Sequence, residues 1–137
     1  MPAYLLDSNA FSELIHSPHG PVANVYRSKV ADPGSRLLTS IIVACEVRYG
    51  AARKGSASLA QRIDRLLASM EVAPLSTGAD DSYATLRSDL ERRGQVIGQN
   101  DMLIAAHALA LDAILVTDNV REFKRVKGLR IENWLRR

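Results

Sequence analysis

Four acidic side chains occupy positions where a carboxylate could do chemistry. Each directly follows a short apolar run or lies at or within a longer apolar segment: Asp7, Glu46, Asp101 and Asp118. An isolated carboxylate in apolar surroundings is costly unless it meets a partner or a cation. If the four converge, their mutual repulsion raises some of their pKa values unless cations compensate. Carboxylate oxygens are hard ligands that suit Mg²⁺ or Mn²⁺, so the four acids predict a site for one or two such ions.

Three of these acids also have a purely structural interpretation. Asp7, in the triplet Asp-Ser-Asn, could only cap a helix, and Asp118 could only form a turn. Asp101 could complement the dipole of a helix at its first turn, which is worth about 0.3–1 kcal/mol. Glu46 differs because the pattern around it is apolar on every helical face. We expect that helix to be enclosed and its carboxylate to lack a route to open solvent, which favours a functional role.

The elements that must position these acids alternate along the chain. Short apolar runs predict strands, and apolar residues at helical spacing between them predict helices. Such alternation predicts an α/β fold with a mainly parallel central sheet covered on both faces. The functional crevice of these sheets lies at the carboxyl ends of the strands, where all four acids fall or lie one helical turn away. The expected strands are 3–6, 36–39, 72–75, 113–117 and 129–131, and the expected helices are 10–15, 22–30, 41–52, 59–70, 76–93 and 100–111, with a further turn and helix that start at 118–119.

Composition narrows the class of protein. The 137 residues include 18 Lys+Arg and 15 Asp+Glu, a net charge of +3, with 47% hydrophobic residues, and we expect a single domain over 1–137. Aromatic residues make up only 5%, which argues against a single-strand binder built on base stacking. The lone cysteine, Cys45, excludes an intramolecular disulfide and is expected to pack within its apolar helix. Without a signal peptide or a long apolar span, the sequence predicts a cytoplasmic protein with no membrane contact.

A set of motifs recurs in a fixed order along nearly the whole chain. It comprises residues 5–9 (LLDSN), 40–50, 86–94, 97–108 (IGQNDMLIAAHA), 115–119 (LVTDN), then Glu122-Phe123, Val126, 128–129 and Trp134. In this order and spacing the chain resembles the PIN-domain ribonucleases, in particular the VapC toxins of type II toxin–antitoxin pairs.

The resemblance implies a PIN fold, which is an α/β/α sandwich, with Asp7, Glu46, Asp101 and Asp118 as an acidic pocket that holds Mg²⁺ or Mn²⁺. Position 118 is the less constant acid of the family and is often Asn. The implied activity is endonucleolytic cleavage of structured RNA, such as tRNA or rRNA, which inhibits translation and growth. The implied partners are a VapB-like antitoxin that blocks the pocket and a second copy of the chain. Hydrogen bonds from three further residues could hold the carboxylates in place: Asn9, Thr117 and Asn119.

Basic residues are concentrated at the carboxyl end of the chain. Residues 121–137 hold seven basic and two acidic side chains, a local net charge of +5. The residues nearest the last acid could contact RNA phosphates or could form a solvated basic face. These residues are Arg121, Lys124, Arg125 and Lys127.

His107 is not expected to share a metal with Asp101. It lies six residues further along the same expected helix, about 240° around the axis. We interpret it as a core or hydrogen-bonding histidine.

Two other classes of function stay open on the sequence alone. One is a catalytically silent PIN-like module that binds RNA or protein. The other is a phosphotransfer protein, either a receiver domain or a haloacid-dehalogenase-type phosphatase, because these also place an Asp after the first strand. The phosphatase pattern needs a second Asp where this chain has Asn9.

Overall fold

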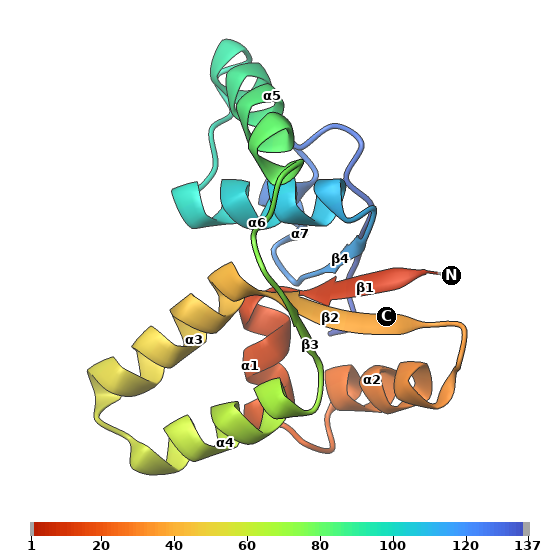
Figure 1. Ribbon diagram of the computed structural model, residues 1–137, viewed down its shortest axis with the longest axis vertical. Coiled ribbons are helices and arrows are strands. Elements are labelled where there is room, and N and C mark those ends of the chain that lie inside the picture. The colour runs from red at the N-terminus through yellow and green to blue at the C-terminus, as the bar shows by residue number, and fades with distance from the viewer. Residues whose placement is uncertain (1, 136–137) are drawn as a thin grey trace.

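The computed structural model describes residues 2–135 as a parallel sheet between helices (Figure 1). Its five strands lie in the order β3-β2-β1-β4-β5, and every neighbouring pair is parallel. The predicted parallel sheet is therefore confirmed. A receiver domain orders its strands 2-1-3-4-5, so the fold contradicts that alternative. The strands are β1 (Ala3–Leu6), β2 (Arg36–Ser40), β3 (Glu71–Ala73), β4 (Ile114–Val116) and β5 (Ile131–Glu132).

Helices follow the strands as the sequence predicts, with small shifts at their ends. The expected helix 76–93 begins only at Ala79, because Gly78 adopts φ 103°, which helical residues do not. The expected strand 72–75 ends at Ala73, since the following Pro74 has no N–H to donate to a sheet. The helices are α1 (Ser8–His16), α2 (Pro21–Ala31), α3 (Ile41–Lys54), α4 (Ala57–Ala68), α5 (Ala79–Arg92), α6 (Gln99–Ala110) and α7 (Val120–Phe123).

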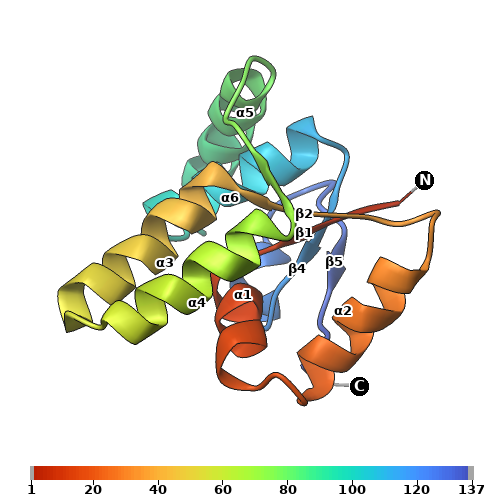
Figure 2. The ribbon, with the colours of Figure 1, turned by 60° about the horizontal axis from the view of Figure 1, so that its bottom comes forward.

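Alternating side chains of β1 divide the core into two layers. Leu5 packs with α3, α4, α5 and α6 on one face of the sheet. Tyr4 and Leu6 pack on the other face with residues of α1 and α2 and with Trp134. Figure 2 shows α2 on one side of the sheet and the pair α3–α4 on the other. The α/β/α sandwich implied by the resemblance is thus the observed architecture.

The expectation that α3 is enclosed is wrong. Helices α3 and α4 form an arm that extends from the sheet, so only one face of α3 contacts the core (Figure 1). Cys45 is exposed rather than packed, Ile41 is 40% exposed, and Glu46 is half-buried. An apolar pattern on every helical face does not require burial on every face, because short apolar residues tolerate exposure.

Within residues 2–135, no helix combines the length and the apolar character that a membrane span requires.

Candidate active site

The register of the sheet brings the ends of its central strands to one edge. Leu6 at the end of β1 pairs with Thr39 of β2 and with Val116 of β4. The backbone N–H of Asp7 continues this ladder by donating to the Val116 carbonyl at 3.0 Å. Asp7 therefore leaves the sheet at the middle of its carboxyl edge, between the starts of the chain segments that follow β2 and β4.

Asp7 is both a helix cap and a buried carboxylate. One of its oxygens accepts from the Ala10 N–H at 2.9 Å, which caps α1 as the structural interpretation expects. The side chain is only 4% exposed, and burial is the main cause that raises its pKa to about 6. The Asp101 charge also raises this pKa, whereas hydrogen bonds from Ala10, Thr117 and the Asn9 backbone lower it. A plain helix cap does not need such a costly position.

Asp101 lies in the first turn of α6 and faces the other acids. Burial is the largest cause that raises its pKa, and the charges of Glu46 and Glu122 raise it further. A Cβ atom at position 98 would lie 3.3 Å from Asp101 Oδ2, so the glycine there leaves room for the carboxylate. The Asp101 charge also raises the pKa of Asp7. Asp101 therefore interacts electrostatically with three other acids, namely Asp7, Glu46 and Glu122.

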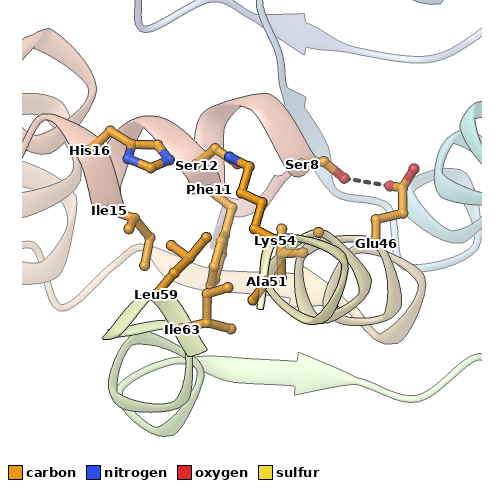
Figure 3. Close-up of a pocket in the computed structure, with 12 residues that line it drawn as sticks. Ser8, Phe11, Ser12, Ile15, His16, Glu46, Ala51, Lys54, Leu59 and Ile63 are labelled. Carbon is orange, nitrogen blue, oxygen red and sulfur yellow. Dashed lines mark hydrogen bonds between the residues drawn. The ribbon is translucent and has the colours of Figure 1, made fainter. Parts of the chain in front are cut away.

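Glu46 is half-buried, not sealed, and two polar side chains hold it. Ser8 Oγ donates a hydrogen bond to its Oε1, as Figure 3 shows, and Asn100 Nδ2 lies 3.4 Å from its Oε2. The carboxylate reaches a shallow cavity of ≈ 390 Å³ that Glu46 shares with residues 98–101. Neither Ser8 nor Asn100 was expected as a site residue. Ser8 follows Asp7 and Asn100 precedes Asp101 in the sequence, and this adjacency to predicted site acids could have indicated both residues.

Asp118 and Glu122 both lie on the segment that follows β4. Asp118 lies half-buried after β4 and accepts a hydrogen bond from Asn133 Nδ2 at 3.0 Å. Glu122, one helical turn further along, interacts with the Asp101 charge and accepts from Asn119 Nδ2 at 3.1 Å. Sequence reasoning missed Glu122, which lies on the short helix α7 just after Asp118.

The three expected supporting residues differ in their contacts. Thr117 is 1% exposed, interacts with the Asp7 carboxylate and accepts from the Asn119 N–H at 2.9 Å. Asn119 directs its side chain to Glu122, whereas Asn9 is exposed and acts on Asp7 through its backbone.

The acids form pairs, not a closed cage. Within residues 2–135, no three Asp, Glu, His or Cys side chains are arranged to hold an ion by themselves. The donors available in the pairs are carboxylate oxygens, which are hard ligands of the kind that Mg²⁺ and Mn²⁺ take.

Three of the four expected RNA contacts are exposed, and Arg125 and Lys127 also contact other parts of the protein. Arg121 and Lys124 are exposed. Arg125 is half-buried and its Nη1 lies 3.4 Å from the Val96 carbonyl, and Lys127 lies 3.5 Å from Asp89 Oδ1. Arg93 Nη2 donates a hydrogen bond to the Arg125 carbonyl, which places a further cation beside these basic residues.

An apolar groove runs from the acidic cluster between α1, α3 and α4. It has a volume of ≈ 160 Å³ and begins at Ser8 and Glu46. Figure 3 shows that its floor is apolar, while Ser12, His16 and Lys54 lie at its rim. The floor residues labelled there are Phe11, Ile15, Ala51, Leu59 and Ile63.

Comparisons with known proteins agree on one family. The PIN domain model matches residues 4–129. The chain is 35% identical to ribonuclease VapC2 of Rickettsia felis over 132 residues, which cover 96% of this chain and 97% of that protein. It is also 35% identical to the tRNA(fMet)-specific endonuclease VapC of Salmonella typhimurium, over 73% of this chain and 76% of the relative. The crystal structure of VapBC2 from Rickettsia felis bound to a promoter DNA fragment contains a chain that matches with a TM-score of 0.90 and 34% identity, covering 96% of this chain and 98% of that one.

Proposed function

Since the chain belongs to the VapC ribonucleases of the PIN-domain family, we propose that it is a toxin that cleaves structured RNA with Mg²⁺ or Mn²⁺ held at its acidic cluster. The observation that carries this proposal is the interaction of Asp101 with Asp7, Glu46 and Glu122 at the carboxyl edge of the sheet. Such a concentration of negative charge costs stability unless a cation offsets it.

Different residues carry different parts of the mechanism. Asp7 and Asp101 would hold the ion, because burial raises the pKa of each carboxyl and the Asp101 charge raises the pKa of Asp7 further. A bound Mg²⁺ supplies a Lewis acid that activates water and offsets charge on the phosphodiester. Glu46, oriented by Ser8 and open to the shallow cavity, is placed to orient the attacking water or take its proton. Asp118 and Glu122 would complete the rim of the cluster.

A transfer RNA is the substrate class that we favour. The Salmonella typhimurium relative is named a tRNA(fMet)-specific endonuclease. Cleavage of a tRNA would inhibit translation and growth, and it would require the protein to act in the cytoplasm.

An antitoxin and a second copy of the chain are the proposed partners. A structure with which the chain shares 34% identity is a VapBC complex. The apolar groove beside Glu46 supports an antitoxin that inserts an apolar segment there and blocks access to the acids. We further propose that residues 1–137 act as one PIN domain.

The proposed activity can be tested directly with purified protein and a mixture of tRNAs. We expect cleavage at defined positions with Mg²⁺, no cleavage with excess EDTA, and recovery when Mn²⁺ is added. Mapping the RNA ends would identify the substrate. Cleavage that persists in EDTA would contradict the metal role, whereas specific RNA binding without cleavage would favour the silent module.

Replacing Ser8 with Ala removes the hydroxyl that orients Glu46, and we expect the single-turnover cleavage rate to fall about tenfold. Ser8→Thr keeps the hydroxyl and should retain most of the activity. Ser12→Ala, one turn further along α1, is the matched control and should cleave at the wild-type rate. Equal rates for Ser8→Ala and Ser12→Ala would contradict this role for Ser8.

Charge removal from the exposed basic residues should weaken RNA binding in a salt-dependent manner. We expect Arg121→Gln and Lys124→Gln each to reduce the slope of log affinity against log salt concentration by about 0.7–0.9. Arg65→Gln, an exposed position on α4, is the control and should leave the slope unchanged. A fluorescence anisotropy titration at four salt concentrations measures this, and parallel slopes for all variants would indicate a merely solvated face.

A further inference from the structure

His107 is a buried titratable residue that the proposed mechanism does not use. It lies on α6, is 1% exposed, and its Nδ1 is 2.7 Å from Ser40 Oγ. Ser40 Oγ also accepts from the Ile42 N–H at 3.0 Å and so caps the start of α3. In the tautomer that carries the ring proton on Nε2, the Ser40 hydroxyl donates to Nδ1.

The other ring nitrogen of His107, Nε2, is buried and makes no hydrogen bond to the described residues. Among residues 2–135, Nε2 is the buried side-chain nitrogen or oxygen that makes no hydrogen bond. Burial lowers the pKa of His107, and the backbone carbonyl of Pro74 opposes this shift. The ring is thus neutral near pH 7 and lies at the meeting point of α6, the start of α3 and the segment after β3.

Two polar contacts join α3 to α6, in addition to the apolar packing of α3 in the core. Ser40 at the start of α3 meets His107 near the end of α6, whereas Glu46 further along α3 meets Asn100 at the start of α6. The order of these contacts makes the two helices antiparallel. On each helix the two contact points are six or seven residues apart, which corresponds to about 9–10 Å. A rotation of α3 by about 10° at the first contact would move Glu46 by more than 1 Å, and such a displacement can cost about 10²-fold in rate.

We propose that His107 is a positioning residue of the acidic site: by binding Ser40 it sets the register of α3 on α6 and so keeps Glu46 opposite Asn100 and Asp101. This inference rests on the proposed function, because the acidic cluster that contains Glu46 and Asp101 is taken as the site of RNA cleavage. His107 itself lies about 1.7 helical turns from Asp101 and does not touch the proposed reacting atoms.

The test compares variants at both ends of the contact. His107→Leu removes the acceptor, whereas His107→Asn can place an amide oxygen near the position of Nδ1. Ser40→Ala removes the hydroxyl and also the cap of α3. Ser56→Ala is its matched control, because Ser56 caps α4 in the same way, accepting from the Leu59 N–H at 3.1 Å, without a histidine partner.

Four measurements separate positioning from stability. Single-turnover cleavage and RNA affinity separate the chemical step from binding, Mn²⁺ affinity is read by electron paramagnetic resonance, and amide chemical shifts report on positions 46 and 101. We expect His107→Leu and Ser40→Ala to cleave at least tenfold more slowly with RNA affinity within twofold, to bind Mn²⁺ more weakly and to shift both amides. His107→Asn should recover most of the rate, and Ser56→Ala should match the wild type.

Unchanged amide shifts at positions 46 and 101 in His107→Leu and Ser40→Ala would overturn the proposal, whether or not the protein cleaves RNA. Equal rate losses in Ser40→Ala and Ser56→Ala would also overturn it. If His107→Leu does not fold, the two serine variants decide the question. A wild-type protein that neither binds Mn²⁺ nor cleaves RNA would refute the proposed function, and the amide shifts would still test the positioning of α3.

Discussion

Asp101→Asn is expected to lower the single-turnover rate of RNA cleavage by at least about 10³-fold while the protein stays folded. Asp101 is the acid whose charge acts on Asp7 and which experiences the charges of Glu46 and Glu122. The amide has nearly the same shape as the carboxylate but is a weak ligand for a hard cation. Its loss should therefore remove metal binding and the chemistry that depends on it.

The matched control for Asp101→Asn is Asp81→Asn. Asp81 also lies in the first turn of a helix, α5, but is exposed. This variant should cleave at the wild-type rate, and both variants should give the same circular dichroism spectrum as the wild type. Substantial cleavage by Asp101→Asn at saturating Mg²⁺ would remove Asp101 from the metal site.

Asp7→Asn is expected to abolish cleavage and, at the same time, to stabilise the metal-free protein. The buried Asp7 carboxyl has a pKa of about 6 in the folded protein against 3.8 for an exposed carboxyl. A difference of this size corresponds to a cost on the order of 3 kcal/mol for holding the ionised group in the fold. Asn removes that cost and can still cap α1 by accepting from the Ala10 N–H.

The raised pKa of Asp7 also determines how the free energy of unfolding changes with pH. Since the folded pKa of Asp7 is the higher one, folding takes up a proton between pH 3.8 and about 6. The contribution of Asp7 to the free energy of unfolding is therefore unchanged below pH 3.8, falls as the pH rises through this window, and is lowest above pH 6.

Urea unfolding of metal-free protein at pH 4 and pH 7.5 measures this contribution. The stability gained by Asp7→Asn should be close to zero at pH 4 and approach its full value at pH 7.5. An equal gain at both pH values, or a loss of stability at pH 7.5, would show that the ionised carboxylate is not the destabilising group.

Much of the fold follows from local sequence patterns. The apolar run 3–6 and the cap at Asp7 predict β1 and α1 because burial on both faces and capping act on neighbouring residues. The exposure of Cys45 was not predictable, because it depends on the direction in which the α3–α4 arm leaves the sheet. No pattern within α3 encodes that direction.

The candidate site was predictable to a similar extent. Asp7 and Asp101 were expected because each adjoins an apolar segment at the carboxyl edge of a parallel sheet. The coupling of Glu122 to Asp101, and the contact between His107 and Ser40, join residues 21 and 67 positions apart. Such pairings depend on how α6 lies against its neighbours, which follows from the packed core and not from the spacing of the residues.

The pairing of β1 with β4 has a consequence for protein synthesis. It joins residues 4–6 to residues 114–116, so the two central strands come from opposite ends of the chain. Asp7 therefore meets Asp101 and the α7 segment only after almost the whole chain has left the ribosome. A nascent or truncated chain that lacks β4 has Asp7, Glu46 and Asp101 but not the assembled cluster. On this topology, a growth-inhibiting nuclease would stay harmless to its own ribosome until its translation is nearly complete.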